Sequence, residues 1–265
     1  MTIDTEVEKF QVGLLKLEIH GTANAACAAA ANAVTESILE KVRGPGNMGV
    51  IFATGTSQIE LLRILTSIRE LPWNRVLGFH LDEYIGIDGN HPASFRHYLR
   101  VNLTDRVKML DFFEIDGSAP DPAAVCREYA QRLRMADPQI CMLGVGENGH
   151  LAFNDPGEAD FEDPEDVKIV ELDPVSRQQQ VSEGWFPIIE DVPERAITVT
   201  IPALFRVPKL VITVLGARKA QILKRVLSDP ISADCPATIL RTHRGATAYL
   251  DRAAAAELNH ELRSS

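Results

Sequence analysis

Short apolar runs that alternate with stretches of helical character restrict the fold of this sequence more than any other feature. The apolar runs are residues 48–53, 76–81, 140–145 and 207–215. The expected helices are residues 22–43, 59–65, 94–99, 123–135 and 217–227. Strands that are apolar along their whole length and alternate with helices form a parallel sheet that is covered on both faces. The sequence therefore predicts an α/β fold with a mostly parallel sheet and helices on both sides.

Length, charge and cysteine content narrow the class of protein. A chain of 265 residues with 45% hydrophobic content can bury one large core, so we expect a single domain over residues 1–265. The formal net charge of -10 argues against nonspecific binding of nucleic acid or anionic membranes. The four cysteines form no CxxC pair, and neither a secretory signal nor a membrane-spanning run is recognisable. We expect a soluble, cytoplasmic protein with reduced thiols.

The segment from residue 155 to residue 193 fits the alternation least well. It is dense in proline, acidic residues and glutamine, so we expect an irregular insertion there, close to the functional site. Ligands of open parallel sheets bind at the carboxyl ends of the strands. Three loops at such ends carry polar residues of interest.

The first loop, FATGTSQ (residues 52–58), leads from a strand through a glycine-bearing turn into a helix. Backbone N–H groups at a helix start, beside the Thr56 and Ser57 hydroxyls, form a cradle for phosphate. The loop matches neither a Walker motif nor a GxGxxG fingerprint. A hydroxyl cap on the helix after a tight turn is the alternative, and this motif taken alone favours it.

The second loop follows the apolar run at residues 76–81 and begins with Asp82 and Glu83. Buried carboxylates are costly unless they are paired or used, so an acidic pair at a strand end suggests a general base. Alternation along the strand places Asp82 and Glu83 on opposite sides. We expect Asp82 to face the cluster of loops and Glu83 to hold its own loop. Solvation of the loop or a helix cap would also explain the pair.

The third loop, LGVGENGHLAFNDPG (residues 143–157), presents His150 directly after an Asn-Gly turn. Asp155 lies within reach if the intervening residues curl back, and such a carboxylate would orient the imidazole as an acid or base. The other histidines and the cysteines lie at no ligand spacing, so we expect no metal site. A lone histidine is often structural, but its delivery by a strand end, a turn and a nearby carboxylate favours function.

These segments together resemble the glucosamine-6-phosphate deaminase (isomerase) family, which is related to the 6-phosphogluconolactonases. The matching segments between residues 51 and 249 are TGTSQ (54–58), LDEYIGIDGNHPASF (81–95), GVGENGHLAFNDPG (144–157), LGARKA (215–220) and CPATILRTH (235–243). The third segment resembles the deaminase branch, because lactonases read DGHTASLFP there. The resemblance implies a modified Rossmann-like fold.

The family's functional residues fall on the positions already singled out. The resemblance makes Asp82 the proton-transferring aspartate, His150 the ring-opening histidine and Asp155 its acidic partner. It also places the substrate phosphate against Gly55, Thr56, Ser57 and Lys219. Three features depart from the pattern: Asn148 stands where some members have aspartate, Asp155 replaces the commoner glutamate, and the arginine of the family's NxRFF segment has no clear match. Arg177 could correspond to a different family arginine.

The resemblance implies conversion of glucosamine 6-phosphate and water to fructose 6-phosphate and ammonia, with no metal or organic cofactor. Nothing in the loops fixes the orientation of the C4 hydroxyl, so galactosamine 6-phosphate is an alternative substrate. Lactone hydrolysis and non-catalytic sensing of a sugar phosphate are further alternatives. We expect a small-molecule sugar phosphate as the partner, without nucleic acid or membrane, and the sequence leaves homo-oligomerisation open.

Overall fold

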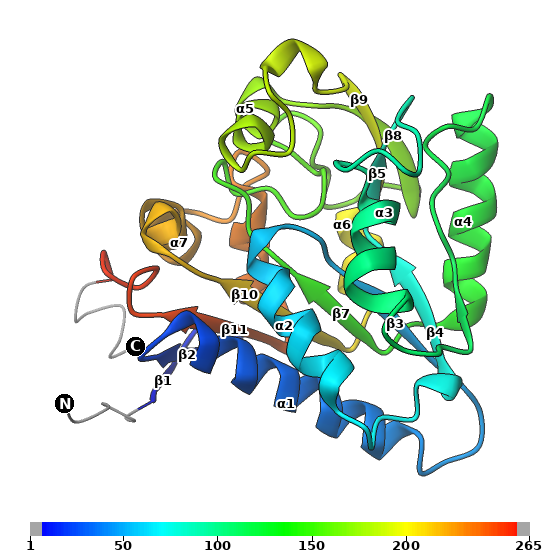
Figure 1. Ribbon diagram of the computed structural model, residues 1–265. Helices are drawn as coiled ribbons and strands as arrows, with labels where there is room; N and C mark the ends of the chain where they lie inside the picture. Colours follow the sequence, from blue (N-terminus) through cyan, green and yellow to red (C-terminus); the bar gives the residue numbers. More distant parts are fainter. Residues whose placement is uncertain (1–6, 259–265) are drawn as a thin grey trace.

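An eight-stranded sheet forms the centre of the computed structural model, which describes residues 7–258 (Figure 1). Its strand order is β1-β2-β11-β10-β7-β3-β4-β6, and every neighbouring pair is parallel except β1 and β2. The strands are β1 (Glu8–Val12), β2 (Leu15–His20), β3 (Met48–Phe52), β4 (Val76–His80), β6 (Asp111–Phe112), β7 (Ile140–Leu143), β10 (Lys209–Val214) and β11 (Ala246–Asp251). The four predicted apolar runs supply β3, β4, β7 and β10, which are four adjacent inner strands of the sheet.

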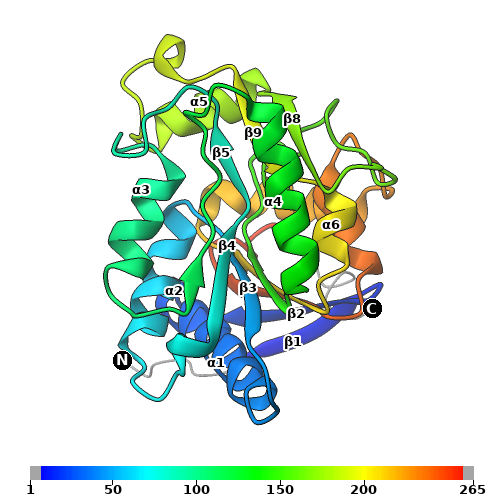
Figure 2. The same ribbon diagram turned by 90° about the vertical axis from the view of Figure 1, so that its right-hand side faces the viewer.

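Helices cover both faces of this sheet. They are α1 (Ala23–Lys41), α2 (Thr56–Ser67), α3 (Phe95–Leu99), α4 (Pro122–Ala136), α5 (Pro174–Ser182), α6 (Ile201–Phe205) and α7 (Ala220–Ser228). Short 3-10 or π-helical turns are η1 (Trp73–Arg75), η2 (Arg100–Thr104), η3 (Ile189–Asp191), η4 (Ala217–Lys219) and η5 (Pro236–Thr242). In Figure 2, α2 and α3 lie on one side of the sheet and α4 and α6 on the other. The predicted α/β architecture is confirmed.

Local sequence signals explain where these elements begin and end. The Thr22 hydroxyl accepts a hydrogen bond from the backbone N–H of Ala25, and α1 starts at the next residue after Thr22. The helix stops before the Gly-Pro-Gly stretch at residues 44–46. Strands β3 and β7 are buried along their whole length, because helices cover both of their faces.

A second, three-stranded sheet lies above the carboxyl edge of the large one. Its strands, all antiparallel, are β5 (Asp82–Tyr84), β9 (Arg195–Val199) and β8 (Val167–Glu171), in that order (Figure 1). A small apolar cluster that includes Tyr84, Phe153 and Phe186 packs beneath it. This sheet and α5 cover the loops at the carboxyl ends of β3, β7 and β10.

The expectation of an irregular insertion at residues 155–193 is wrong. The segment contains β8, α5 and η3, although it does lie at the candidate site. The helix escaped prediction because its buried residues are the polar Ser176, Gln179 and Gln180, so apolar periodicity is absent.

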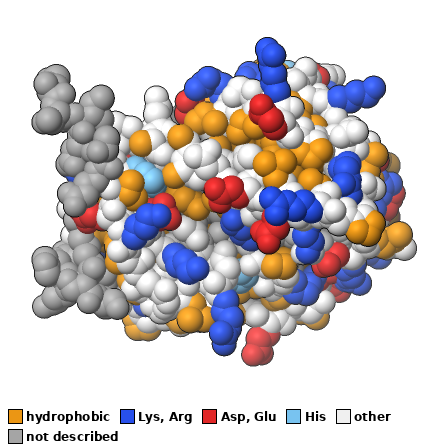
Figure 3. All heavy atoms as spheres, turned by 90° about the horizontal axis from the view of Figure 1, so that it is seen from below, with side chains coloured by type: hydrophobic (Ala, Val, Ile, Leu, Met, Phe, Trp, Pro, Cys, Tyr) orange, Lys and Arg blue, Asp and Glu red, His pale blue; other side chains and the backbone are white. Residues whose placement is uncertain are grey.

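The outer surface mixes charges of both signs on the face drawn in Figure 3. Interspersed acidic and basic side chains differ from the continuous basic surface by which proteins bind nucleic acid. Within residues 7–258, no helix combines the length and apolar character needed to cross a bilayer.

Candidate active site

A pocket of about 370 Å³ opens where the carboxyl ends of β3, β7 and β10 meet the small sheet and α5. Its walls contain six of the residues that the sequence singled out: Gly55, Thr56, Ser57, Asp82, His150 and Lys219. Asn148 and Asp155 do not reach the pocket and stand behind His150. The structure thus gathers residues from four loops, distant in sequence, around one cavity.

The start of α2 leaves its first N–H groups open toward this pocket. Gly55 is the residue before the helix, and neither Thr56 nor Ser57 caps it with a side chain. The first N–H groups of a helix have no partner within the helix, so they remain available to an anion. The alternative of a hydroxyl cap is therefore wrong. Gly55 has φ of 98°, and a Cβ there would meet nothing within 4 Å, so the backbone conformation is what favours glycine.

Lys219 brings a cation to the wall of the same pocket. It lies at the end of η4, which follows Gly216, and Asp251 fixes that glycine by accepting its N–H at 3.0 and 3.1 Å. Burial lowers the pKa of Lys219 below its usual range, against the opposing effect of Glu147 and Glu183. Among the pocket-lining residues that the structure describes, Lys219 is the one lysine or arginine.

No arginine from the described part of the chain joins Lys219 in the pocket wall. Arg177 donates from Nη2 to the carbonyl oxygens of Ile189 and Val192, at 2.8 and 2.9 Å. Its guanidinium therefore holds the segment that follows α5 against that helix.

Asp82 begins β5, where it pairs with Thr198 of β9, and its carboxylate lines the pocket. The strand of the large sheet ends at His80, so Asp82 belongs to the second sheet. Only 6% of Asp82 is exposed, and none of the hydrogen bonds within residues 7–258 involves its carboxylate. Burial raises the pKa of Asp82 well above its usual range, and the charges of Glu83 and Asp155 raise it further.

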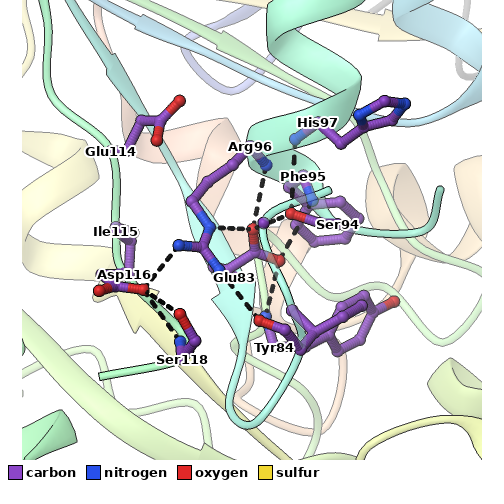
Figure 4. Close-up of polar contacts among 12 residues, drawn as sticks. Glu83, Tyr84, Ser94, Phe95, Arg96, His97, Glu114, Ile115, Asp116 and Ser118 are labelled. Atoms are coloured by element: carbon purple, nitrogen blue, oxygen red, sulfur yellow. Dashed lines mark hydrogen bonds and ion pairs between the residues drawn. The ribbon is translucent and has the colours of Figure 1, made fainter. Parts of the chain in front are cut away.

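Glu83 does not line the pocket. Both of its carboxylate oxygens accept hydrogen bonds (Figure 4). Its carboxylate accepts from the Ser94 hydroxyl at 2.7 Å, from Arg96 Nε at 3.2 Å and from three backbone N–H groups. Arg96 also donates to Asp116 at 2.6 Å and to the carbonyl oxygen of Ile87 at 3.0 Å. These contacts tie both ends of the loop after β5 to the start of α3.

His150 is held by its own loop and by α5. Its Nδ1 lies 2.8 Å from Asp155 Oδ1 and 2.8 Å from the Ser176 hydroxyl, which also donates to Asp155. A carboxylate acceptor at Nδ1 requires a proton there, so Nε2 is the ring atom left for exchange in the pocket. The ring lies so close to Gly146 that a Cβ at this position would come within 2.3 Å of it.

Asn148 connects the turn to the carboxylate behind the ring. Its Oδ1 accepts from the backbone N–H of His150 at 3.1 Å, and its Nδ2 donates to Asp155 Oδ1 at 3.0 Å. Burial alone would raise the pKa of Asp155, but hydrogen bonds and charge from His150, with further hydrogen bonds from Ser176 and Asn148, lower it below its usual range. Asp155 is therefore held as an anion that orients the imidazole.

Sequence reasoning missed the contribution of α5. Gln179, Gln180 and Glu183 line the pocket, and Ser176 touches His150. These four residues follow the spacing i, i+3, i+4, i+7, so they occupy one face of a helix. The sequence SRQQQVSE (residues 176–183) contains this polar stripe, but apolar periodicity alone does not detect it.

The fold and this pocket are those of an α/β enzyme that acts on sugar phosphates. Comparison with known proteins gives the same class. The chain belongs to the glucosamine-6-phosphate isomerase/6-phosphogluconolactonase family, whose model matches residues 21–249. A glucosamine-6-phosphate deaminase of Exiguobacterium sp. strain AT1b is 31% identical over 227 residues, which cover 86% of this chain and 87% of that protein. The deaminase of Pseudarthrobacter chlorophenolicus is 30% identical, with 84% and 86% covered.

Solved structures give the same grouping. A monomeric glucosamine-6-phosphate deaminase has a TM-score of 0.84 at 28% identity, covering 91% of this chain and 99% of its own. A 6-phosphogluconolactonase of Thermotoga maritima has a TM-score of 0.71 at 18% identity, covering 90% of this chain and 99% of its own, and shares the fold.

Within residues 7–258, no group of three or more His, Cys, Asp or Glu side chains is arranged to hold a metal ion.

Proposed function

We propose that this protein is a glucosamine-6-phosphate deaminase, which converts glucosamine 6-phosphate and water to fructose 6-phosphate and ammonia. The observation that carries the proposal is that one pocket contains Asp82, a buried carboxylate that no hydrogen bond within residues 7–258 reaches, and His150, a histidine that a carboxylate orients. The names of the relatives with about 30% identity support the same reaction.

The phosphate of the substrate binds at the start of α2. The N–H groups and hydroxyls of Thr56 and Ser57 donate to its oxygens, and the positive end of the helix dipole favours its charge. Gly55 provides the backbone conformation of this turn. Lys219 supplies a positive point charge, and the phosphate dianion forms an ion pair with it.

His150 moves the proton that opens the sugar ring. Asp155 accepts the hydrogen bond from Nδ1 and stabilises the protonated ring, while Asn148 and Ser176 hold Asp155 in place. Ring opening exposes the C1 aldehyde, which makes the proton on C2 acidic.

Asp82 then takes the proton from C2, which leaves an enolamine, and returns it to C1, which gives a ketose imine at C2. Water adds to the imine to release ammonia and leave the C2 ketone. A raised pKa brings the basicity of Asp82 closer to that needed near neutral pH. The oxidation levels balance, because one carbon gains the hydrogen that its neighbour loses.

The experiment is the release of ammonia and fructose 6-phosphate from glucosamine 6-phosphate by the purified protein. His150→Gln should lose on the order of 10²–10⁴-fold in turnover, as expected for a positioned acid–base group. His97→Gln is the matched control, because His97 lies on α3 outside the pocket wall. Parallel assays with galactosamine 6-phosphate and 6-phosphogluconolactone identify the alternatives, and faster turnover of either compound would contradict the proposal.

The extent of the domain over residues 1–265, the cytoplasmic location and the state of assembly stay predictions from the sequence. Size-exclusion chromatography with light scattering measures the assembly, and the solved relative described as a monomeric deaminase makes a monomer our proposal.

A further inference from the structure

Helix α5 reverses the usual pattern of an amphipathic helix. Its buried residues are Ser176, Gln179 and Gln180, and its exposed residues include Val175. Helices normally bury an apolar stripe against a core, where polar groups are costly. A buried polar stripe is stable when it faces a cavity that water or a ligand fills, and Gln179 and Gln180 line the pocket together with Glu183.

Three of the four members of the stripe, Ser176, Gln179 and Glu183, are engaged in hydrogen bonds with protein groups. The Gln179 carboxamide accepts from the backbone N–H of Glu147 at 3.1 Å and donates to Glu183 at 2.7 Å. Trp185 Nε1 donates to the other oxygen of Glu183 at 3.3 Å. Gln179 therefore connects the turn before His150 to the end of α5.

Gln180 differs from its neighbour. It is 8% exposed and lines the pocket, yet no hydrogen bond within residues 7–258 uses its carboxamide. Among the described residues, the fully enclosed side-chain atoms that lack a partner do not include those of this amide, so it opens into the pocket, where a bound ligand can hydrogen-bond it. The carboxamide offers both an acceptor and a donor, which is the combination that matches hydroxyl groups.

Helix geometry fixes where along the substrate this amide lies. Ser176, which touches His150, precedes Gln180 by four residues, or about 6 Å along the axis at 1.5 Å per residue. Glu183 follows three residues later, about 4.5 Å further along, and is hydrogen-bonded by Gln179. Gln179 also accepts from the N–H of Glu147, whose carboxylate pairs with Arg218, the residue before Lys219. Gln180 therefore lies between the proton-transfer end and the phosphate end of the pocket.

We propose that Gln180 is a specificity-determining residue that hydrogen-bonds the hydroxyls at C3 and C4 of the bound amino sugar phosphate. This inference rests on the proposed function, because a chain with C1 at His150 and the phosphate at Lys219 places C3 and C4 in the middle. The 4-epimer presents its C4 hydroxyl in another direction, so Gln180 favours glucosamine over galactosamine 6-phosphate.

The test compares Gln180→Ala with Gln178→Ala, its exposed neighbour on the opposite face of α5. For Gln180→Ala we expect kcat/KM for glucosamine 6-phosphate to fall about ten- to hundredfold, and the preference over galactosamine 6-phosphate to shrink about tenfold. Gln178→Ala should change neither value. The melting temperature of Gln180→Ala should stay at or above that of the wild type, whereas a structural glutamine would lower it.

Calorimetric binding of fructose 6-phosphate separates this proposal from the proposed function. Wild-type binding without any ammonia release would overturn the deaminase assignment alone, and weaker binding by Gln180→Ala would still support the role of the amide. Unchanged affinity and kcat/KM in Gln180→Ala would overturn the inference and leave the deaminase intact. Failure of the wild type to bind any of these sugar phosphates would overturn both.

Discussion

Asp82 and Glu83 are neighbours in sequence and both are buried, but their surroundings differ completely. Glu83 accepts five hydrogen bonds, including two from Arg96. Asp82 accepts none from the described residues and faces the pocket. The comparison teaches that hydrogen-bond completion separates the two roles better than burial does: a satisfied carboxylate fixes structure, and an unsatisfied one beside a cavity is available for chemistry.

The largest expected effect comes from Asp82→Asn. The amide cannot accept the C2 proton, so kcat should fall on the order of 10²–10⁴-fold. The fold should survive, since no hydrogen bond within residues 7–258 depends on the carboxylate. Ammonia release and circular dichroism measure the two outcomes, and a variant that retains a tenth of the wild-type kcat would contradict the assigned role.

The same substitution has a predicted sign for stability. Because the folded-state pKa of Asp82 is raised, ionisation of this carboxyl destabilises the fold as pH rises from its ordinary value through its folded value. Asp82→Asn removes that penalty, so its melting temperature at neutral pH should exceed that of the wild type by a few degrees, or about 1 kcal/mol. The difference should shrink as the pH falls toward the ordinary carboxyl range, and a pH-independent difference would show that burial of charge is not its cause.

Glu83→Gln should show the opposite balance. Removing one member of a buried ion pair should lower the free energy of unfolding by about 3 kcal/mol, because Arg96 loses one of its two carboxylate partners and the new amide cannot accept all five hydrogen bonds. Urea denaturation measures this loss. Glu114→Gln is the matched control, since Glu114 pairs with Arg100 in a partly exposed ion pair that should contribute about 1 kcal/mol or less.

Ser176→Ala should have a smaller, purely kinetic effect. The hydroxyl contacts both His150 Nδ1 and Asp155, so its loss should lower kcat about tenfold without a comparable change in KM. The pKa of Asp155 should rise toward its ordinary value when this donor is lost, so the acidic limb of the pH–kcat profile should move to higher pH. An unchanged profile with a lower melting temperature would indicate a structural hydroxyl instead.

Asn148→Asp is expected to have the smallest effect. A carboxylate cannot replace the Nδ2 donor to Asp155, but the acceptor for the N–H of His150 is retained. We expect kcat/KM to fall by about tenfold or less, in line with the loss of one hydrogen bond away from the substrate. A loss as large as that of Asp82→Asn would mean that Asn148 takes part in the chemistry.

The sequence predicted the parts of the fold and site that depend on short-range patterns. Four apolar runs became inner strands, and the Asn-Gly turn brought His150 back toward Asp155 within the span of eight residues from 148 to 155. Alternation along an extended chain was sufficient to separate Asp82 from Glu83. These features follow from local geometry, which sequence spacing records.

The parts that the sequence did not predict depend on distant partners. Strand β5 has three residues and pairs with β9, more than a hundred residues later, so nothing local announces it. The polar stripe of α5 becomes interpretable once the cavity beside it is known. Ser176 and Gln180 were therefore invisible to a search for hydrophobic periodicity, although their spacing is helical.

The most direct test of the central claim measures ammonia release from glucosamine 6-phosphate by Asp82→Asn and Glu83→Gln side by side, each normalised to folded protein. We expect Glu83→Gln to retain at least a tenth of the wild-type kcat per folded molecule, and Asp82→Asn to lose on the order of 10²-fold or more. Equal losses in the two variants, or a greater loss in Glu83→Gln, would contradict the assignment of proton transfer to the unsatisfied carboxylate.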